Sequence, residues 1–88
     1  MKSNVLSNAL TKNGKFQDKD GVLSASNMPA TLYVAIGNTM LTIEKVRSVR
    51  LADDAVTIET RSETFVLAHE DVRAVRIENS SPRAGLTP

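Results

Sequence analysis

The sequence predicts an all-β domain: a small six-stranded meander that forms a barrel or two packed sheets. Within residues 29–78, apolar side chains alternate with polar ones, which is the pattern of half-buried strands. Turn-forming dipeptides divide this zone into short segments. A pattern of eight residues occurs twice in it. Together these observations predict two similar β-β-bend-β units in one small fold.

Length and charge exclude several classes of protein. The chain has 88 residues, enough for one domain with little room for a deep cleft. Its 11 basic and 10 acidic residues leave a net charge of +1, too little to attract nucleic acid or a membrane surface by field alone. No apolar run approaches the ~20 residues of a membrane span. There are no cysteines, and the first residues lack the apolar centre of an export signal. We therefore expect a cytoplasmic protein.

The composition divides the chain into three parts. Residues 1–28 are a polar N-terminal arm. The spacing of Val5, Leu6, Ala9 and Leu10 allows a short helix there, and the sequence leaves open a helix or a hairpin. Residues 29–78 are the duplicated β domain. Residues 79–88 contain Ser, Pro and Gly with almost nothing to bury, so we expect a flexible tail.

The expected strands of the β domain follow one another through tight turns. Gly37-Asn38 and Arg61-Ser62 are the expected hairpin turns. Asp53-Asp54 marks a polar break between two further strands. The six strands are expected around residues 32–36, 41–43, 49–51, 56–58, 65–67 and 75–77.

An internal repeat organises these strands. Residues 44–51 recur as residues 70–77, with five of eight positions identical. A regular strand cannot place Val46 and Val49 on one face, because successive side chains alternate between faces. Val46, and Val72 in the second copy, must therefore lie in a bend that fills the edge of the core. The expected core is Leu32, Val34, Ile36, Leu41, Ile43, Val46, Val49, Leu51, Val56, Ile58, Phe65, Leu67, Val72, Val75 and Ile77.

The sequence gives little support for a catalytic or metal-binding site. His69 is the one histidine, and without a second histidine or a cysteine we interpret it as a partly buried residue of the bend. Asp18, Asp20 and Gly21 imitate part of a calcium-binding loop, but the residues at that loop's first and last ligand positions are not carboxylates. We therefore expect no enzyme, no cofactor and no metal site.

Four arginines occupy equivalent places in the two copies of the repeat: Arg47, Arg50, Arg73 and Arg76. If they share one surface, they suit contacts with phosphate groups or with a partner. However, residues 29–78 hold six basic and eight acidic side chains, and a nucleic-acid footprint normally needs a basic patch. A nucleic-acid-binding module that uses the paired arginines is therefore the alternative hypothesis.

Apolar residues also occur at positions that should face water. Tyr33, Met40 and Val66, with Ala35 and Ala68, lie out of phase with the expected core. A sheet with one face in water normally carries polar residues there, so the arm or another chain should cover this face. We expect a non-catalytic domain that acts through protein–protein contacts, as a homo-oligomer or as an accessory of a larger assembly. Tyr33, Met40 and Val66 are its candidate interface.

The hydrophobic spacing of residues 31–78, with the bend Glu70-Asp71-Val72-Arg73-Ala74-Val75, resembles that of two protein families. One is the short flagellum-associated proteins of the FlbD type, and the other is the β-rich part of LytTR-type DNA-binding domains. The resemblance implies a similar architecture, and no function follows from it.

Overall fold

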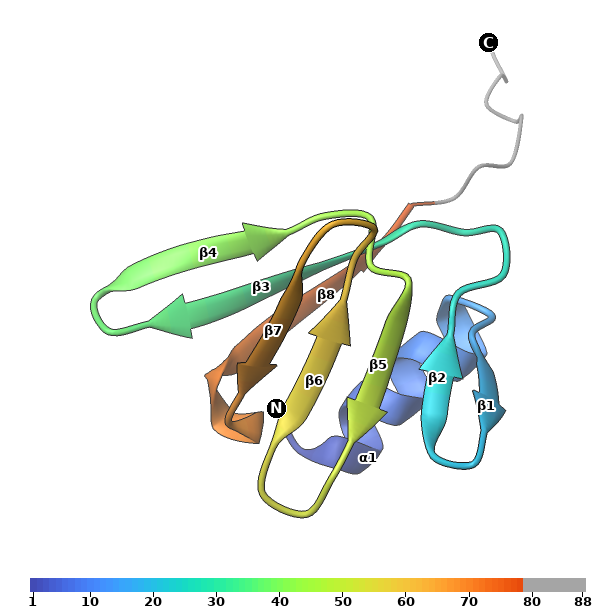
Figure 1. Ribbon diagram of the computed structural model, residues 1–88, viewed down its shortest axis with the longest axis horizontal. Coiled ribbons are helices and arrows are strands. Elements are labelled where there is room, and N and C mark those ends of the chain that lie inside the picture. The colour runs from blue at the N-terminus through green and yellow to red at the C-terminus, as the bar shows by residue number, and fades with distance from the viewer. Residues whose placement is uncertain (79–88) are drawn as a thin grey trace, which may run out of the picture.

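The computed structural model describes residues 1–78, which form two antiparallel sheets and one helical segment (Figure 1). The larger sheet has the strand order β1-β2-β5-β6-β7 and the smaller one β4-β3-β8. The prediction of a small all-β domain is confirmed, although the sheets do not close into a barrel. The tail expected at residues 79–88 lies outside the described residues.

Residues 1–78 contain two more strands than the six expected, and both lie in the N-terminal arm. Helix α1 (Ser3–Asn8) continues into the π-helical segment η1 (Ala9–Asn13), and η2 (His69–Asp71) is a 3₁₀ turn. The strands are β1 (Gln17–Lys19), β2 (Val22–Ser24), β3 (Ala30–Ile36), β4 (Thr39–Ile43), β5 (Ser48–Leu51), β6 (Val56–Glu59), β7 (Thr64–Leu67) and β8 (Val72–Ile77).

The two copies of the repeat exchange their last strands. The first copy forms β3, β4 and β5, and the second forms β6, β7 and β8. β5 pairs with β6, the first strand of the other copy, and β8 pairs with β3 in the same way. The register is equivalent too, since Val49 lies opposite Ile58 and Val75 lies opposite Leu32. Each sheet thus contains strands from both copies.

In the first copy, the chain passes from one sheet to the other at a sharp bend. Lys45 has a φ of 55°, and Val46 follows it with only 2% of its surface exposed. The Val46 N–H donates to the Ala30 carbonyl in the smaller sheet at 3.0 Å. The next N–H, that of Arg47, donates to the Glu59 carbonyl in the larger sheet at 2.8 Å. Val46 therefore fills the core at the crossing point, as the repeat predicts.

The second copy reaches the same result by different means. The 3₁₀ turn η2 precedes Val72, of which 1% is exposed. The pairing of β8 with β3 then shifts between Tyr33 and Val34, where β8 has one extra residue. Such a bulge changes the phase of side-chain alternation. Val72 and Val75 can therefore both face the core from one strand.

The N-terminal arm is built into the core. Leu6 and Leu10, four residues apart on the helical segment, are fully buried. The side chains of Phe16 and Leu23 are almost completely buried as well. The arm's hairpin turns at Asp20-Gly21, where both residues have positive φ. Its strand β2 pairs with β5 and extends the larger sheet. Residues 1–28 thus hold both a helix and a hairpin.

One expected core residue is exposed. Ile36 lies at the end of β3 with half of its surface in solvent, so its assignment to the core is wrong. The β3–β4 hairpin extends past the larger sheet (Figure 1), which leaves its tip without a second layer. Within residues 1–78, no helix is long and apolar enough to cross a membrane.

Candidate interaction surface

The structure divides the four arginines between the two sheets. Arg47 and Arg50 lie just before and within β5 of the larger sheet, and Arg73 and Arg76 lie on β8 of the smaller one. All four are exposed. Because the sheets pack through their inner faces, the outward-facing Arg50 and Arg76 leave the molecule on different sides. The single arginine surface considered from the sequence does not form.

Carboxylates share the surroundings of two of these arginines. Arg47 lines a hollow that includes Glu59, whose Oε1 accepts a hydrogen bond from the Ser48 hydroxyl at 2.9 Å. Arg76 lines another hollow with Glu44 and Glu78. These surroundings are of mixed charge, whereas a nucleic-acid footprint is basic.

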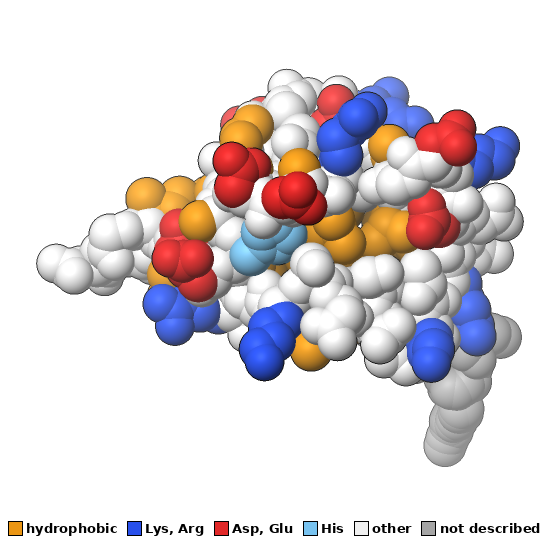
Figure 2. Space-filling view, turned by 90° about the horizontal axis from the view of Figure 1, so that it is seen from below, with side chains coloured by type: hydrophobic (Ala, Val, Ile, Leu, Met, Phe, Trp, Pro, Cys, Tyr) orange, Lys and Arg blue, Asp and Glu red, His pale blue; other side chains and the backbone are white. Residues whose placement is uncertain are grey.

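His69 links two turns of the fold. Its Nε2 lies 2.6 Å from the Ala52 carbonyl, which can only accept, so Nε2 donates the proton. Its Nδ1 is buried without a hydrogen-bond partner. Figure 2 shows acidic side chains around the histidine, and Asp53, Asp54 and Glu70 line the same hollow. Within residues 1–78, no group of three or more His, Asp or Glu residues could hold a metal ion. The contact of His69 with Ala52 connects η2 to the β5–β6 turn.

The three candidate interface residues lie on the outer faces of two different sheets. Tyr33 is half-buried on the smaller sheet, and Met40 lies near it on β4 with 56% of its surface exposed. Val66 lies on the larger sheet with 65% exposed. The arm leaves Met40 and Val66 uncovered, and its buried side chains Leu6, Leu10, Phe16 and Leu23 pack into the core instead.

The strands that carry Met40 and Val66 border an open seam between the sheets. β4 is an edge strand of the smaller sheet and β7 is an edge strand of the larger one. A groove of about 410 Å³ lies between them. We call it the seam groove. Its lining residues are Leu41, Thr42, Ile43, Glu44, Lys45, Thr60, Arg61, Ser62, Glu63 and Phe65.

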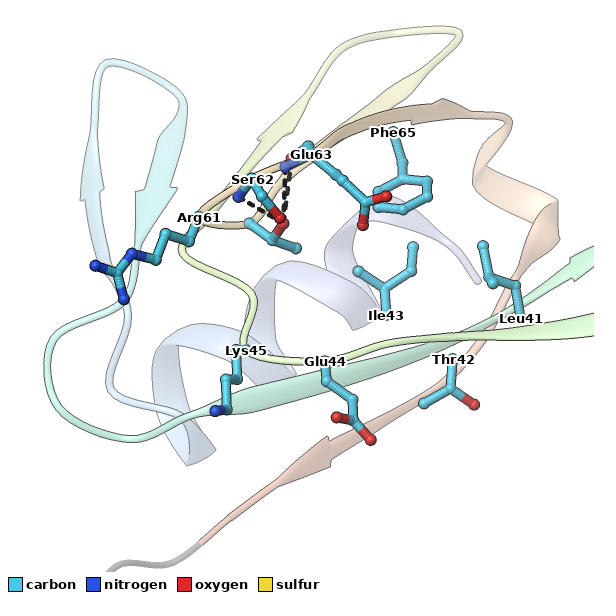
Figure 3. Close-up of a pocket in the computed structure, with 10 residues that line it drawn as sticks. Leu41, Thr42, Ile43, Glu44, Lys45, Arg61, Ser62, Glu63 and Phe65 are labelled. Carbon is cyan, nitrogen blue, oxygen red and sulfur yellow. Dashed lines mark hydrogen bonds between the residues drawn. The ribbon is translucent and has the colours of Figure 1, made fainter.

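The interior of the seam groove is apolar and its mouth is charged. Leu41 and Ile43 on β4 point toward Phe65 on β7, as Figure 3 shows. Ile43 is buried, whereas Leu41 and Phe65 stay partly exposed. Lys45, past the end of β4, and Glu63, just before β7, line the groove from its two sides, and Figure 3 shows their charged groups pointing in different directions.

A small hydrogen-bond network fixes the turn that carries Glu63. The Thr60 N–H donates to the Glu63 carbonyl at 2.8 Å. The Thr60 hydroxyl oxygen accepts from the Glu63 N–H at 3.1 Å and from the Ser62 N–H at 3.4 Å. Such side-chain contacts stabilise a turn without help from the rest of the protein. They hold the start of β7 in place beside the groove.

From the sequence, Leu41, Ile43 and Phe65 are expected in the core, and the seam between the sheets is not predicted. The sequence does contain a signal for the seam, in the distribution of charged residues among the strands. Edge strands of soluble proteins commonly carry charged residues that prevent pairing with other chains. Of the four edge strands in the described part of the chain, β1 contains Asp and Lys and β8 contains two Arg, whereas β4 (TMLTI) and β7 (TFVL) contain no charge.

Comparison of the chain with models of known protein families, with curated proteins and with solved structures finds no match. The architectural resemblance described above therefore assigns the chain to no family.

Proposed function

We propose that this protein is a non-catalytic β domain that works through protein–protein contacts in the cytoplasm, by self-association or as an accessory of a larger assembly. The uncharged edge strands β4 and β7, on either side of the seam groove, carry this proposal. Their unpaired backbone groups and apolar side chains favour the addition of another chain.

The exposed hydrophobic side chains support the same function. Ile36, Met40 and Val66 are each at least half exposed, and all three belong to β3, β4 or β7. Scattered apolar residues are normal on a protein surface, but Met40 and Val66 lie on edge strands, where exposed apolar side chains indicate an interaction site. Met40 and Val66 thus belong to the two strands that border the seam groove, and each lies on the outer face of its own sheet.

Self-association is tested by light scattering and sedimentation over a range of protein concentrations. We expect the mass to rise above that of the 9.5 kDa monomer. Val66→Ser should weaken association severalfold, because it removes apolar surface that association buries. Val5→Ser is the matched control, since Val5 is also a half-exposed valine but lies on α1.

A second variant tests the assignment of the faces. Tyr33→Ser should leave the circular dichroism spectrum intact and weaken association. If it abolishes folding without changing assembly, the assignment of Tyr33 to the outer face is wrong. If the unmodified protein stays a strict monomer at every concentration, self-association is excluded.

Nucleic-acid binding through the arginines remains the alternative proposal. It requires binding to DNA or RNA that weakens with salt and is lost in the variant Arg47→Ala/Arg73→Ala. Salt-independent or absent binding would exclude it.

A further inference from the structure

We propose that a second copy of this chain closes the seam: β4 of each copy pairs with β7 of the other, antiparallel, around a two-fold axis. This inference rests on the proposed function and names its partner. It starts from the contrast among the four edges. β1 and β8 carry charges that discourage pairing, and β4 and β7 carry none.

The hydrogen-bonding groups of the two edges are in phase. The two-residue turn Gly37-Asn38 closes the first hairpin on the pair Ile36 and Thr39. Such a turn closes on a hydrogen-bonded pair, and bonded and free residues then alternate along an antiparallel strand. Met40 and Thr42 therefore direct their N–H and C=O groups toward the free edge of β4.

The same reasoning applies to β7. Thr60 and Glu63 are hydrogen-bonded through their backbones at 2.8 Å. Alternation from this pair directs the N–H and C=O groups of Thr64 and Val66 toward the free edge. On both strands, the residues with free backbone groups are those whose side chains face outward. A pair of these edges can therefore bond without turning either strand over.

One register matches the side chains as well. With Leu41 opposite Leu67 of the other copy, Ile43 lies opposite Phe65 on the inner face, and Thr42 lies opposite Val66 on the outer face. Cross-strand pairs of apolar and β-branched residues stabilise sheets. The same register brings Lys45, in the bend two residues past the end of β4, near Glu63, which directly precedes β7 of the other copy. The apolar pairs thus set the alignment, and this alignment brings two opposite charges to the same end of the seam.

A two-fold axis forms both contacts at once. Each copy has β4 on one side of its seam and β7 on the other, so two open seams that face each other supply both partners. The dimer then has two continuous sheets, each made of the smaller sheet of one copy and the larger sheet of the other. Both uncharged edges are paired, and the interface is isologous and closed. An edge strand from a different protein would satisfy the backbone groups, but the match of Lys45 to Glu63 is a property of this chain with itself.

Charge reversal tests the pairing. In Lys45→Glu and in Glu63→Lys, both seams of the dimer place like charges opposite each other. Each variant alone should therefore dimerise roughly tenfold more weakly than the unmodified chain, with an effect that shrinks at high salt. In a one-to-one mixture, the introduced glutamate faces the introduced lysine in one seam and the native Lys45–Glu63 pair forms in the other. The mixture should recover the dimer.

The controls separate this inference from the proposed function. Lys19→Glu makes the same charge change on the edge strand β1 and should leave the dimer unchanged, and circular dichroism should show that every variant is folded. A dimer of the unmodified chain with no recovery in the mixture would overturn the proposed pairing and leave protein–protein contact standing. A monomeric unmodified chain would overturn both self-association and the pairing. Recovery in the mixture, seen by light scattering and by cross-linking of differently tagged copies, would support it.

Discussion

The two copies of the repeat use equal lengths of chain differently. The same number of residues separates Leu32 from Val46 and Ile58 from Val72. The first copy places most of this length in a long hairpin, with seven residues in β3 and five in β4. The second has four-residue strands β6 and β7 and uses the remaining residues for the turn η2.

The comparison shows which features the core requires. Both copies keep the buried bend valine and the register of the last strand against the other copy. The length of the first hairpin in each copy differs, because the extra residues of β3 and β4 extend past the larger sheet and do not contribute to the shared core. The long hairpin exposes Ile36 and Met40, so the variable feature is also the one that supplies apolar surface to the region of the seam.

The arm adds a second difference between the copies. β5, the last strand of the first copy, pairs with β6 on one side and with β2 of the arm's hairpin on the other. β8, the last strand of the second copy, is flanked instead by the arm's helical segment. The two pack closely, since a Cβ added to Gly14, at the end of η1, would lie only 2.8 Å from Ile77 Cδ1. The two equivalent strands are thus flanked by different structures.

The largest expected effect comes from a charge in either bend. Val46→Asp and Val72→Asp each bury a carboxylate among apolar side chains, and we expect each to cost more than about 4 kcal/mol. That loss should abolish the cooperative thermal transition followed by circular dichroism. Arg47→Asp, at an exposed position beside Val46, is the control that should fold. If only one of the two bend variants unfolds, the bends are not equivalent.

A smaller loss is expected from truncation of the arm. Leu10 on η1 and Leu23 on β2 are both buried, so Leu10→Ala and Leu23→Ala should each cost about 2–5 kcal/mol. Urea unfolding measures both. A change under about 0.5 kcal/mol would mean that the arm is an appendage rather than part of the core.

The smallest effect distinguishes the two hairpin turns. Gly37 has a φ of 60° with no atom near its missing side chain, so Gly37→Ala should cost about 1 kcal/mol from backbone strain alone. Neither Arg61 nor Ser62 has a positive φ, and Ser62→Ala should change the free energy of unfolding by less than about 0.5 kcal/mol. Equal costs in urea unfolding would contradict this difference.

Local patterns predicted the strands of the β domain, and long-range pairing decided the rest. Alternation and the Gly37-Asn38 and Arg61-Ser62 turns place six strands correctly. The pairing of β8 with β3 has no local signal, and neither has the exposure of Ile36, which depends on where the other sheet ends. The strands of the arm have three residues each, too few to show alternation. The sequence marked Met40 and Val66 as apolar on outward positions, but only the structure brings Lys45 and Glu63 to one groove.

The exchange of last strands has a consequence for folding. β3 finds its partner β8 only at the far end of the described chain, so the smaller sheet cannot form until nearly the whole domain has been synthesised. Neither copy can complete a sheet by itself. Such distant pairing slows folding, because a long loop must close before its contacts stabilise the structure. We therefore expect a single cooperative folding transition, with the second edge of β3 left unpaired in the nascent chain until β8 arrives.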